Sequence, residues 1–323
     1  MNTIEEIAGV LTRVKSAVIF THTRPDGDAI GSALALSRAF FVKNIKNEVV
    51  VDGDIPEKFS YLEGIKAIRQ EPSFEAECFV CVDASDLNRL GELQKCFLAG
   101  VKRKVITVNI DHHISNTKFC KYNFVQNISS NCENIARVIT AMGVKCEGEI
   151  ASCLMTGLVT DSGACSHSDV NGDTFRTAAM LVDGGADVNQ ITYDTFRKQS
   201  KARAQMYLEV LGKLHYWHND KLVVAVITQD ILQKYGLKPD ATEGIVDFGL
   251  TIDSVEVSVC IMQVKKHQYK ASFRSKGKVN VNEVAGVFGG GGHILASGCM
   301  FFGEIEEILD KLSYIVWQRL EVE

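Results

Sequence analysis

Residues 17–36 of the chain read AVIFTHTRPDGDAIGSALAL, and this stretch decides the fold. Four apolar residues open it, as expected of a strand that is buried on both faces. A polar loop follows, and the residues that come next are spaced for one face of a helix: Ile30, Leu34, Ser37 and Phe41. A buried strand that runs through an acidic loop into a helix is typical of an open α/β sheet.

Three further apolar runs in the first half of the chain support this fold. They are EVVV at 48–51, FVCV at 79–82 and VITVNI at 105–110. Later, Ser130 and Glu133 form a predicted capping box at the start of a helix. The alternation of strands and helices predicts a mostly parallel sheet with helices on both faces.

The second half of the chain has a different pattern. From about residue 187 the sequence turns polar and helix-prone, and the apolar runs LVVAVIT and VEVSVCIMQV come after it. A basic segment, a glycine run and an amphipathic helix follow. We therefore predict an α/β domain over 1–190, a linker helix over 191–215 and a smaller α+β domain over 216–323.

Bulk properties exclude several classes of protein. A net charge of −5 disfavours a protein that wraps long duplex nucleic acid. No apolar run approaches the roughly 18 residues of a membrane span, and the N-terminus lacks the apolar core of a signal peptide. The ten cysteines are scattered, which favours reduced thiols and a cytoplasmic location. Cys78 and Cys81 would point to opposite faces of a strand, so they are no metal pair.

Acids and histidines follow apolar runs at four places. They are His22, Asp26 and Asp28; Asp83; Asp111, His112 and His113; and Asp161 in GLVTDSG. The carboxyl ends of parallel strands share one edge of a sheet, where ligands bind, so we expect the first three groups to meet. The fourth group reaches them only through tertiary folding, which the sequence does not specify.

This set of side chains suits divalent metal ions. Carboxylates are the oxygen ligands of hard ions, and imidazole joins them for Mn²⁺, Fe²⁺ or Zn²⁺. Two ions about 3.5–4 Å apart can clamp a phosphoryl group when a carboxylate bridges them. Gly27 would permit a turn that lets Asp26 and Asp28 serve different ions. Each Asp alone, Asp28 above all, is more often a turn former or helix N-cap, but their coincidence at strand ends favours a metal site.

Five motifs resemble those of the DHH phosphoesterases and span nearly the whole chain. They are THTRPDGDAIGS, FVCVDASD, NIDHHISN, LVTDSG and, resembling the DHH-associated C-terminal domain, SFRSKGKVNVNEVAGVFGGGGHILASG. Within the superfamily, the two-domain size is most similar to enzymes that degrade very short RNA (nanoRNA) and also dephosphorylate 3′-phosphoadenosine 5′-phosphate (pAp). The resemblance makes 1–190 the catalytic domain and 216–323 a substrate-binding domain.

The resemblance also implies a site with two divalent ions, with Mn²⁺ favoured. The implied ligands are His22, Asp26 and Asp83 for one ion, and Asp28, Asp83, His112 and Asp161 for the other. Asp83 would bridge the ions and share the catalytic role with His113, which would lie beside the reacting phosphate. Asp111 would orient the histidines.

The C-terminal domain is expected to hold the rest of the substrate. The basic segment at 264–278 contains no acid and would attract anions. The resemblance implies that Arg274 grips a phosphate, which suits its planar fork. It also implies a substrate clamp at the start of a helical segment, made by Gly290, Gly291, Gly292 and His293. The run lacks the G-K-[ST] ending of a P-loop.

One motif departs from the family. It reads TDSGACSHS, so Cys165 stands where an aromatic residue is usual. The departure leaves open how this loop contacts a base. His167 could replace the missing ring, but an ordinary histidine of a surface loop is the favoured interpretation.

The resulting prediction is a two-metal phosphoesterase that cuts short oligonucleotides to mononucleotides and removes the 3′-phosphate of pAp. Its partners would be short single-stranded RNA or DNA, or small nucleotides, with no long duplex and no membrane, and a homodimer stays open. A phosphodiesterase for cyclic dinucleotides such as cyclic di-AMP, or for linear pApA, would share every motif.

Three further functions fit the sequence less well. A single-strand DNA exonuclease of the superfamily usually carries additional domains, and an inorganic pyrophosphatase lacks the glycine–histidine motif. A catalytically silent nucleotide sensor would not need the intact set of metal ligands.

Overall fold

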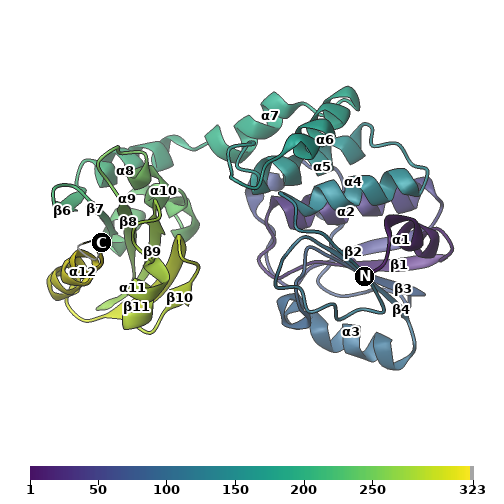
Figure 1. Ribbon diagram of the computed structural model, residues 1–323, viewed down its shortest axis with the longest axis horizontal. Helices are drawn as coiled ribbons and strands as arrows, with labels where there is room; N and C mark the ends of the chain where they lie inside the picture. Colours follow the sequence, from purple (N-terminus) through teal and green to yellow (C-terminus); the bar gives the residue numbers. More distant parts are fainter. Residues whose placement is uncertain (321–323) are drawn as a thin grey trace. The chain divides into compact units, whose positions relative to one another are not determined.

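The computed structural model describes residues 1–320 and divides into two compact units, Met1–Lys198 and Gln199–Glu323 (Figure 1). The boundary between the units falls inside the predicted linker. The last three residues of the predicted domain over 216–323 lie outside the described residues, and the predicted domain limits stay predictions.

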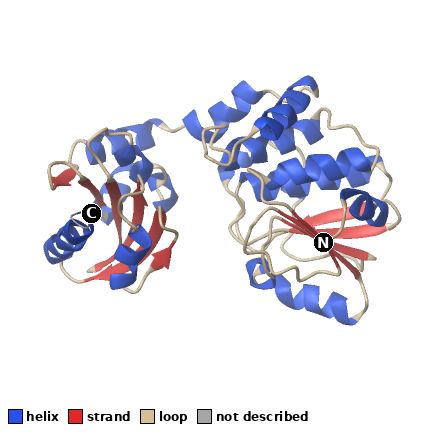
Figure 2. Ribbon diagram, viewed as in Figure 1, coloured by secondary structure: helices blue, strands red, loops and turns tan. Residues whose placement is uncertain are grey.

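A five-stranded sheet in which every strand is parallel forms the centre of the first unit (Figure 2). Its order is β2-β1-β3-β4-β5. The strands are β1 (Ser16–Phe20), β2 (Lys46–Val50), β3 (Cys78–Val82), β4 (Ile106–Asp111) and β5 (Tyr122–Val125). The four predicted strands are confirmed as β1 to β4. Sequence reasoning missed β5, whose four residues include no long apolar run.

Helices cover both faces of this sheet, which confirms the predicted fold class. One face packs on α1 (Ile4–Leu11), α2 (Gly27–Val42), α4 (Asn131–Ala141) and α5 (Glu149–Asp161), and the other on α3 (Leu93–Lys102). Ile19 lies in the first core and its neighbour Phe20 in the second, because successive strand residues point to opposite faces. Figure 1 shows α2 and α3 on opposite sides of the strands. The remaining helices of this unit are α6 (Gly172–Asp183) and α7 (Val188–Thr192), which pack against α5.

Two details of the helices differ from expectation. Ser130 caps α4 by accepting a hydrogen bond from the Cys132 amide, but Glu133 does not complete the capping box. It accepts a hydrogen bond from Thr174 of α6 instead. Phe41, which was expected on the buried face of α2, is 66% exposed in its last turn.

The predicted linker helix is interrupted in the structure. A π-helical turn, Tyr193–Arg197, follows α7, and α8 (Lys201–Leu211) begins only after an extended residue at Lys198. Ser200 starts α8 by accepting a hydrogen bond from the Arg203 amide.

The second unit contains a six-stranded mixed sheet in the order β10-β11-β9-β8-β7-β6. Only β7 and β8 run parallel; the other pairs are antiparallel. The strands are β6 (His215–Trp217), β7 (Leu222–Ile227), β8 (Val257–Lys265), β9 (Gln268–Ser275), β10 (Gly291–Gly292) and β11 (Ala296–Phe302). One face packs on α11 (Val281–Val287) and α12 (Ile305–Leu320), and the other on α8, α9 (Gln229–Tyr235) and α10 (Ile245–Leu250). The predicted α+β character is confirmed.

Ten free thiols are distributed through the two units. Cys78 and Cys81 are both buried but belong to separate cores on opposite faces of β3, as predicted. Within residues 1–320, no helix is both long and apolar enough to cross a membrane.

Candidate metal centre

The order of the strands explains why distant segments of the first unit meet. β1 lies between β2 and β3, so the chain adds β2 on one side of β1 and then β3 to β5 on the other side. The switch point of the strand order is therefore between β1 and β3. Side chains that follow the strands at such a switch point face a common crevice. His22 follows β1, Asp83 follows β3 and His112 follows β4.

Two histidines are aimed by the backbone. Nδ1 of His22 lies 2.8 Å from the carbonyl oxygen of Thr23, and Nδ1 of His112 lies 2.9 Å from that of Ile128. Because a carbonyl oxygen only accepts, each Nδ1 must donate. Each neutral ring therefore presents the lone pair of Nε2 to the centre, which is the arrangement of a metal-binding histidine.

Asp83 lies between the two rings. Its Oδ2 is 3.6 Å from Nε2 of His22, and its Oδ1 is 3.4 Å from Nε2 of His112. The residue is 2% exposed, and Oδ1 has no hydrogen-bond partner among the described residues. Its φ of 54° lies in the left-handed region, which costs a non-glycine residue about 1–2 kcal/mol. A strained, buried carboxylate with one oxygen outside any hydrogen bond indicates a functional role.

The two carboxylates of the D-G-D step have different surroundings. Asp26 is the N-cap of α2, because its Oδ1 accepts from the amides of Asp28 and Ala29, and its Oδ2 lies 3.8 Å from Nε2 of His22. Asp28 is therefore not the cap. Its buried carboxylate accepts from Ser130 and the first amides of α4, and its Oδ2 lies 3.9 Å from Nε2 of His112.

Glycines allow α2 and α5 to approach closely. A Cβ at Gly27 would lie 2.5 Å from the side chain of Thr160, and one at Gly157 would lie 2.6 Å from Oδ1 of Asp28. Gly27 was expected to permit a turn, but it lies in the first turn of α2 without a positive φ. The structure instead requires glycine there for contact between helices.

Asp161, the last residue of α5, completes the centre. Its Oδ2 lies 3.4 Å from Nε2 of His112. The three residues after Ser162 have φ values of 57°, 55° and 64°, a left-handed turn that includes Ala164 and Cys165. His167 follows this turn, and its Nδ1 donates to the carbonyl oxygen of Asp161 at 2.7 Å. His167 therefore fixes the end of α5, a role that the sequence did not indicate.

His113 is oriented by a buried network. Its Nδ1 donates to Oδ1 of Asp111 at 2.9 Å, and this contact raises the pKa of His113. The other Asp111 oxygen accepts from the amide of Asn116, which also bonds to Asn109. Asp111 was expected to orient both histidines, but His112 is held by the backbone. Asn116 was missed, although it lies in the motif NIDHHISN, because nothing in the sequence shows that the chain turns back there.

Charges in the cluster shift its proton affinities. Burial raises the pKa of Asp28 to about 7 and that of Asp161 to about 9, and neighbouring carboxylates add to both effects. Burial opposes ionisation of Asp83, but the two histidines outweigh it and hold its pKa well below the usual range. Burial lowers the pKa of His22 and His112, yet the carboxylates outweigh it and raise them to about 10 and 11. The shifts have the directions expected where several carboxylates share one buried site.

The donor atoms fit metal ions. Three groups have ligand atoms within 4.8 Å of one another: His22, Asp26 and Asp83; Asp28, His112 and Asp161; and Asp83, His112 and His113. The contacts of 3.4–3.9 Å are longer than hydrogen bonds and approach the spacing of about 3 Å between ligands of one octahedral ion. Neutral Nε2 atoms and carboxylates are all acceptors, so a cation between them would satisfy both.

The predicted substrate residues lie in the second unit. Arg274 is on β9, where its Nε donates to Oδ1 of Asp247 at 2.8 Å and its Nη1 donates to the Phe273 carbonyl. Ala296 of β11 pairs with Arg274 and closes a tight turn on His293, so these residues share one end of the sheet.

We expected His293 at the start of a helical segment, but the structure has no helix there. The glycine run folds instead into the short strand β10 (Gly291–Gly292), because Gly290 and Gly292 come too close to β11 for a side chain. The three glycines and His293 are otherwise half-buried or exposed.

The predicted basic patch is spread along the β8–β9 hairpin and the residues after it. Lys276 is exposed, but its Nζ is engaged by the protein, because it donates to the carbonyl oxygens of Ile252 and Asp253. Lys270 and Arg274 do share a face, since alternate residues of a strand point the same way.

A parallel sheet with histidines and carboxylates at its switch point, followed by a separate α+β unit, defines a two-domain α/β protein with a candidate centre for divalent metal ions. Residues 16–158 match the model of the DHH family N-terminal domain, and residues 219–318 match the DHHA1 domain. The chain belongs to the DHH family.

Similar proteins agree with this assignment. The chain is 28% identical to the bifunctional oligoribonuclease and PAP phosphatase NrnA of Thermus thermophilus, over 97% of this chain and 93% of that protein. The crystal structure of an exopolyphosphatase-related protein from Bacteroides fragilis has a TM-score of 0.87 at 28% identity, covering 98% of this chain and 95% of that one. A more distant relative is the cyclic-di-AMP phosphodiesterase GdpP of Bacillus subtilis, 21% identical over 97% of this chain but 49% of that protein.

Proposed function

We propose that the chain hydrolyses short oligonucleotides to mononucleotides and removes the 3′-phosphate of pAp, with two divalent ions, Mn²⁺ favoured. The observation that carries the proposal is the convergence of two ligand groups on opposite sides of Asp83. The similarity to oligoribonuclease and PAP phosphatase proteins over almost the whole chain supports the substrate class.

The ligand assignment follows from the two groups. The proposed ligands are His22, Asp26 and Asp83 for the first ion, and Asp28, Asp83, His112 and Asp161 for the second. Asp83 has one oxygen toward each ring and would bridge. Two bound ions would lower the pKa of a shared water and stabilise charge on the phosphoryl oxygens.

The chain's own groups would position the substrate and move protons. Nδ1 of His113 is committed to Asp111, so Nε2 is the atom that can donate to a phosphoryl oxygen or to the departing sugar oxygen. Arg274 would bind a phosphate with its remaining donors. The segment of Gly290, Gly291, Gly292 and His293 would contact the same end of the nucleotide, with the His293 side chain as its donor, because the amides of Gly290 and Gly292 already donate to Ala285 and Asn282.

Bulk properties agree with a small, single-stranded substrate. A net charge of −5 provides no general attraction for a long duplex, which leaves recognition to local groups such as Arg274. Ten free thiols, most of them buried, support a reducing compartment and hence the cytoplasm. Assembly as a homodimer stays a prediction.

Turnover by the full chain tests the function. We expect Mn²⁺-dependent release of mononucleotides from di- to pentanucleotides and of phosphate from pAp, both abolished by a chelator. An Arg274→Ala variant should raise KM for both substrates about tenfold while keeping metal-induced thermal stabilisation. Arg176→Ala, an exposed arginine of α6, is the matched control. Absence of release from every substrate would refute the proposal.

A second candidate function is favoured by the similarity to GdpP. The same centre would then act on cyclic di-AMP or its linear product pApA. Comparison of kcat/KM for pAp, short RNA, pApA and cyclic di-AMP separates the two candidates.

A further inference from the structure

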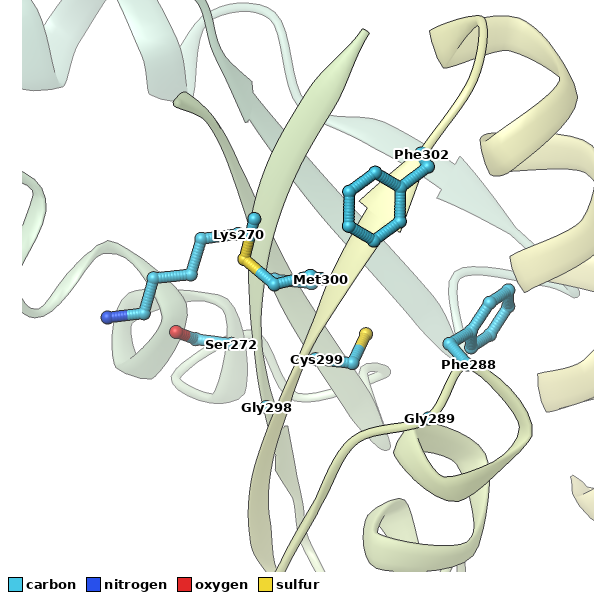
Figure 3. Close-up of a pocket in the computed structure, with 9 residues that line it drawn as sticks. Lys270, Ser272, Phe288, Gly289, Gly298, Cys299, Met300 and Phe302 are labelled. Carbon is cyan, nitrogen blue, oxygen red and sulfur yellow. The ribbon is translucent and has the colours of Figure 1, made fainter. Parts of the chain in front are cut away.

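A cavity of about 430 Å³ lies on the second unit, at the β11 side of the sheet. Its lining is mostly apolar and aromatic, with Phe288 after α11 and Met300 and Phe302 on β11. Gly289, at the start of the glycine run, also lines it. Figure 3 shows the two phenylalanine rings on one side of Met300, and Lys270 and Ser272 on the other.

Two features distinguish this cavity from an ordinary surface hollow. Phe302 is 68% exposed, and Met300 is 37% exposed beside it, so apolar side chains border open space. Within residues 1–320, neither Nζ of Lys270 nor Oγ of Ser272 has a hydrogen-bond or ion-pair partner. By contrast, Lys276 on the same hairpin is bound to two carbonyl oxygens. The exposed ring of Phe302 on one side of Met300 and the ammonium of Lys270 on the other fit a ligand with both an aromatic and an anionic part.

The cavity lies along the strand that carries Arg274. Lys270, Ser272 and Arg274 alternate on one face of β9, opposite Met300, Gly298 and Ala296 of β11. Arg274 lies four positions along the strand from Lys270, a distance of about 13 Å. Between these two positions the face carries only the small residues Ser272 and Gly298, so no bulky side chain of β9 or β11 divides them.

We propose that this cavity is a nucleobase subsite, in which a base stacks on Phe302 and Lys270 with Ser272 binds an adjoining phosphate. The inference rests on the proposed function, because the ligand is a nucleotide of the proposed oligonucleotide substrate, beyond the phosphate at Arg274. Stacking on an aromatic ring does not select one base, so the subsite would distinguish substrates by their number of nucleotides and not by their base sequence. A mononucleotide such as pAp is too short to fill both positions.

Phe302→Ala and Lys270→Ala in the full chain test the proposal, with Phe41→Ala and Lys102→Ala as matched controls on exposed positions of the first unit. We expect KM for a tetranucleotide to rise about tenfold in each test variant, with kcat and the KM for pAp unchanged. The control variants should match the wild type. Equal KM values for the tetranucleotide in all variants would overturn the subsite while leaving the proposed function intact.

A binding measurement keeps the subsite testable if the proposed function fails. Titration of a fluorescently labelled tetra-adenylate in EDTA requires no turnover, and loss of affinity confined to the two test variants supports the subsite. If Phe302→Ala changes the mass of the protein in solution and leaves this affinity unchanged, the cavity is a contact between protein chains and the proposal is overturned.

Discussion

Nε2 of His112 lies 3.4 Å from Oδ2 of Asp161, the last residue of α5. The ring of His112 is fixed by the Ile128 carbonyl, so this contact depends on where α5 ends. The position of α5 depends in turn on its contact with α2, where glycines replace side chains. Helix packing in the core thus sets the spacing of the metal centre.

Gly157→Ala should therefore damage both stability and metal binding. The new Cβ would lie 2.2 Å from Sγ of Cys132 and 2.6 Å from Oδ1 of Asp28. We expect the free energy of unfolding to fall by about 1–3 kcal/mol, with weaker Mn²⁺ binding. Gly9→Ala is the control, because nothing lies within 4 Å of its Cβ and a helical alanine should add about 0.5–1 kcal/mol. Urea unfolding with and without Mn²⁺ measures the free energy of unfolding and the stabilisation by bound Mn²⁺. Equal stability of the two variants would contradict the packing argument.

Asp83→Asn should remove the metal response. Asparagine keeps the size of the side chain and tolerates the positive φ, but it lacks the charge that would bridge two ions. We expect activity to fall at least about a hundredfold and the Mn²⁺-induced rise in melting temperature to disappear. Asp220→Asn is matched, since Asp220 is an exposed aspartate with positive φ in the second unit. A full metal response in Asp83→Asn would remove Asp83 from the ligand set.

Asn116→Ala should affect catalysis more than binding. Its amide holds Asp111, which orients His113, so its loss should lower kcat about 10- to 100-fold with little change in KM. Asn116→Asp should be worse, because a second carboxylate would repel Asp111. Steady-state kinetics at saturating Mn²⁺ measures the effect, and an increase in KM alone would refute a positioning role.

His167→Ala should weaken metal binding without blocking turnover. The variant loses the hydrogen bond from His167 to the carbonyl oxygen of Asp161, which connects the two ends of the left-handed turn between them. We expect about ten times more Mn²⁺ to be needed for half-maximal activity, with a normal rate at saturation. His215→Ala, an exposed histidine of β6, serves for comparison. An unchanged Mn²⁺ dependence would show that the turn holds Asp161 without His167.

The sequence predicted those parts of the fold that have a local signal. β1 to β4 each include an apolar run, because the middle of a parallel sheet is buried on both faces. His22, Asp83 and His112 could be placed together because they follow such strands. β5 and β11 lack such runs: β5 is short, and β11 alternates between core and solvent and contains Gly298.

Long-range features were beyond local reasoning. Asp161 joins the centre at the end of a helix, through packing that no spacing rule describes. The glycine run was expected to lead into a helix, but close contact with β11 makes it a strand. The sequence indicated that Gly27 matters, but the predicted reason, a turn, was wrong. Glycine is required there by contact with the Thr160 side chain, which belongs to a helix far along the sequence.

The aim of His22 and His112 has a further consequence. Main-chain carbonyls hold both rings, and no amino-acid substitution deletes a carbonyl. The first unit can therefore accept many substitutions at its surface without a change in the orientation of the two histidine rings. New substrate preferences would be acquired most readily by altering side chains on β9 and β11, which can vary independently of the reaction itself.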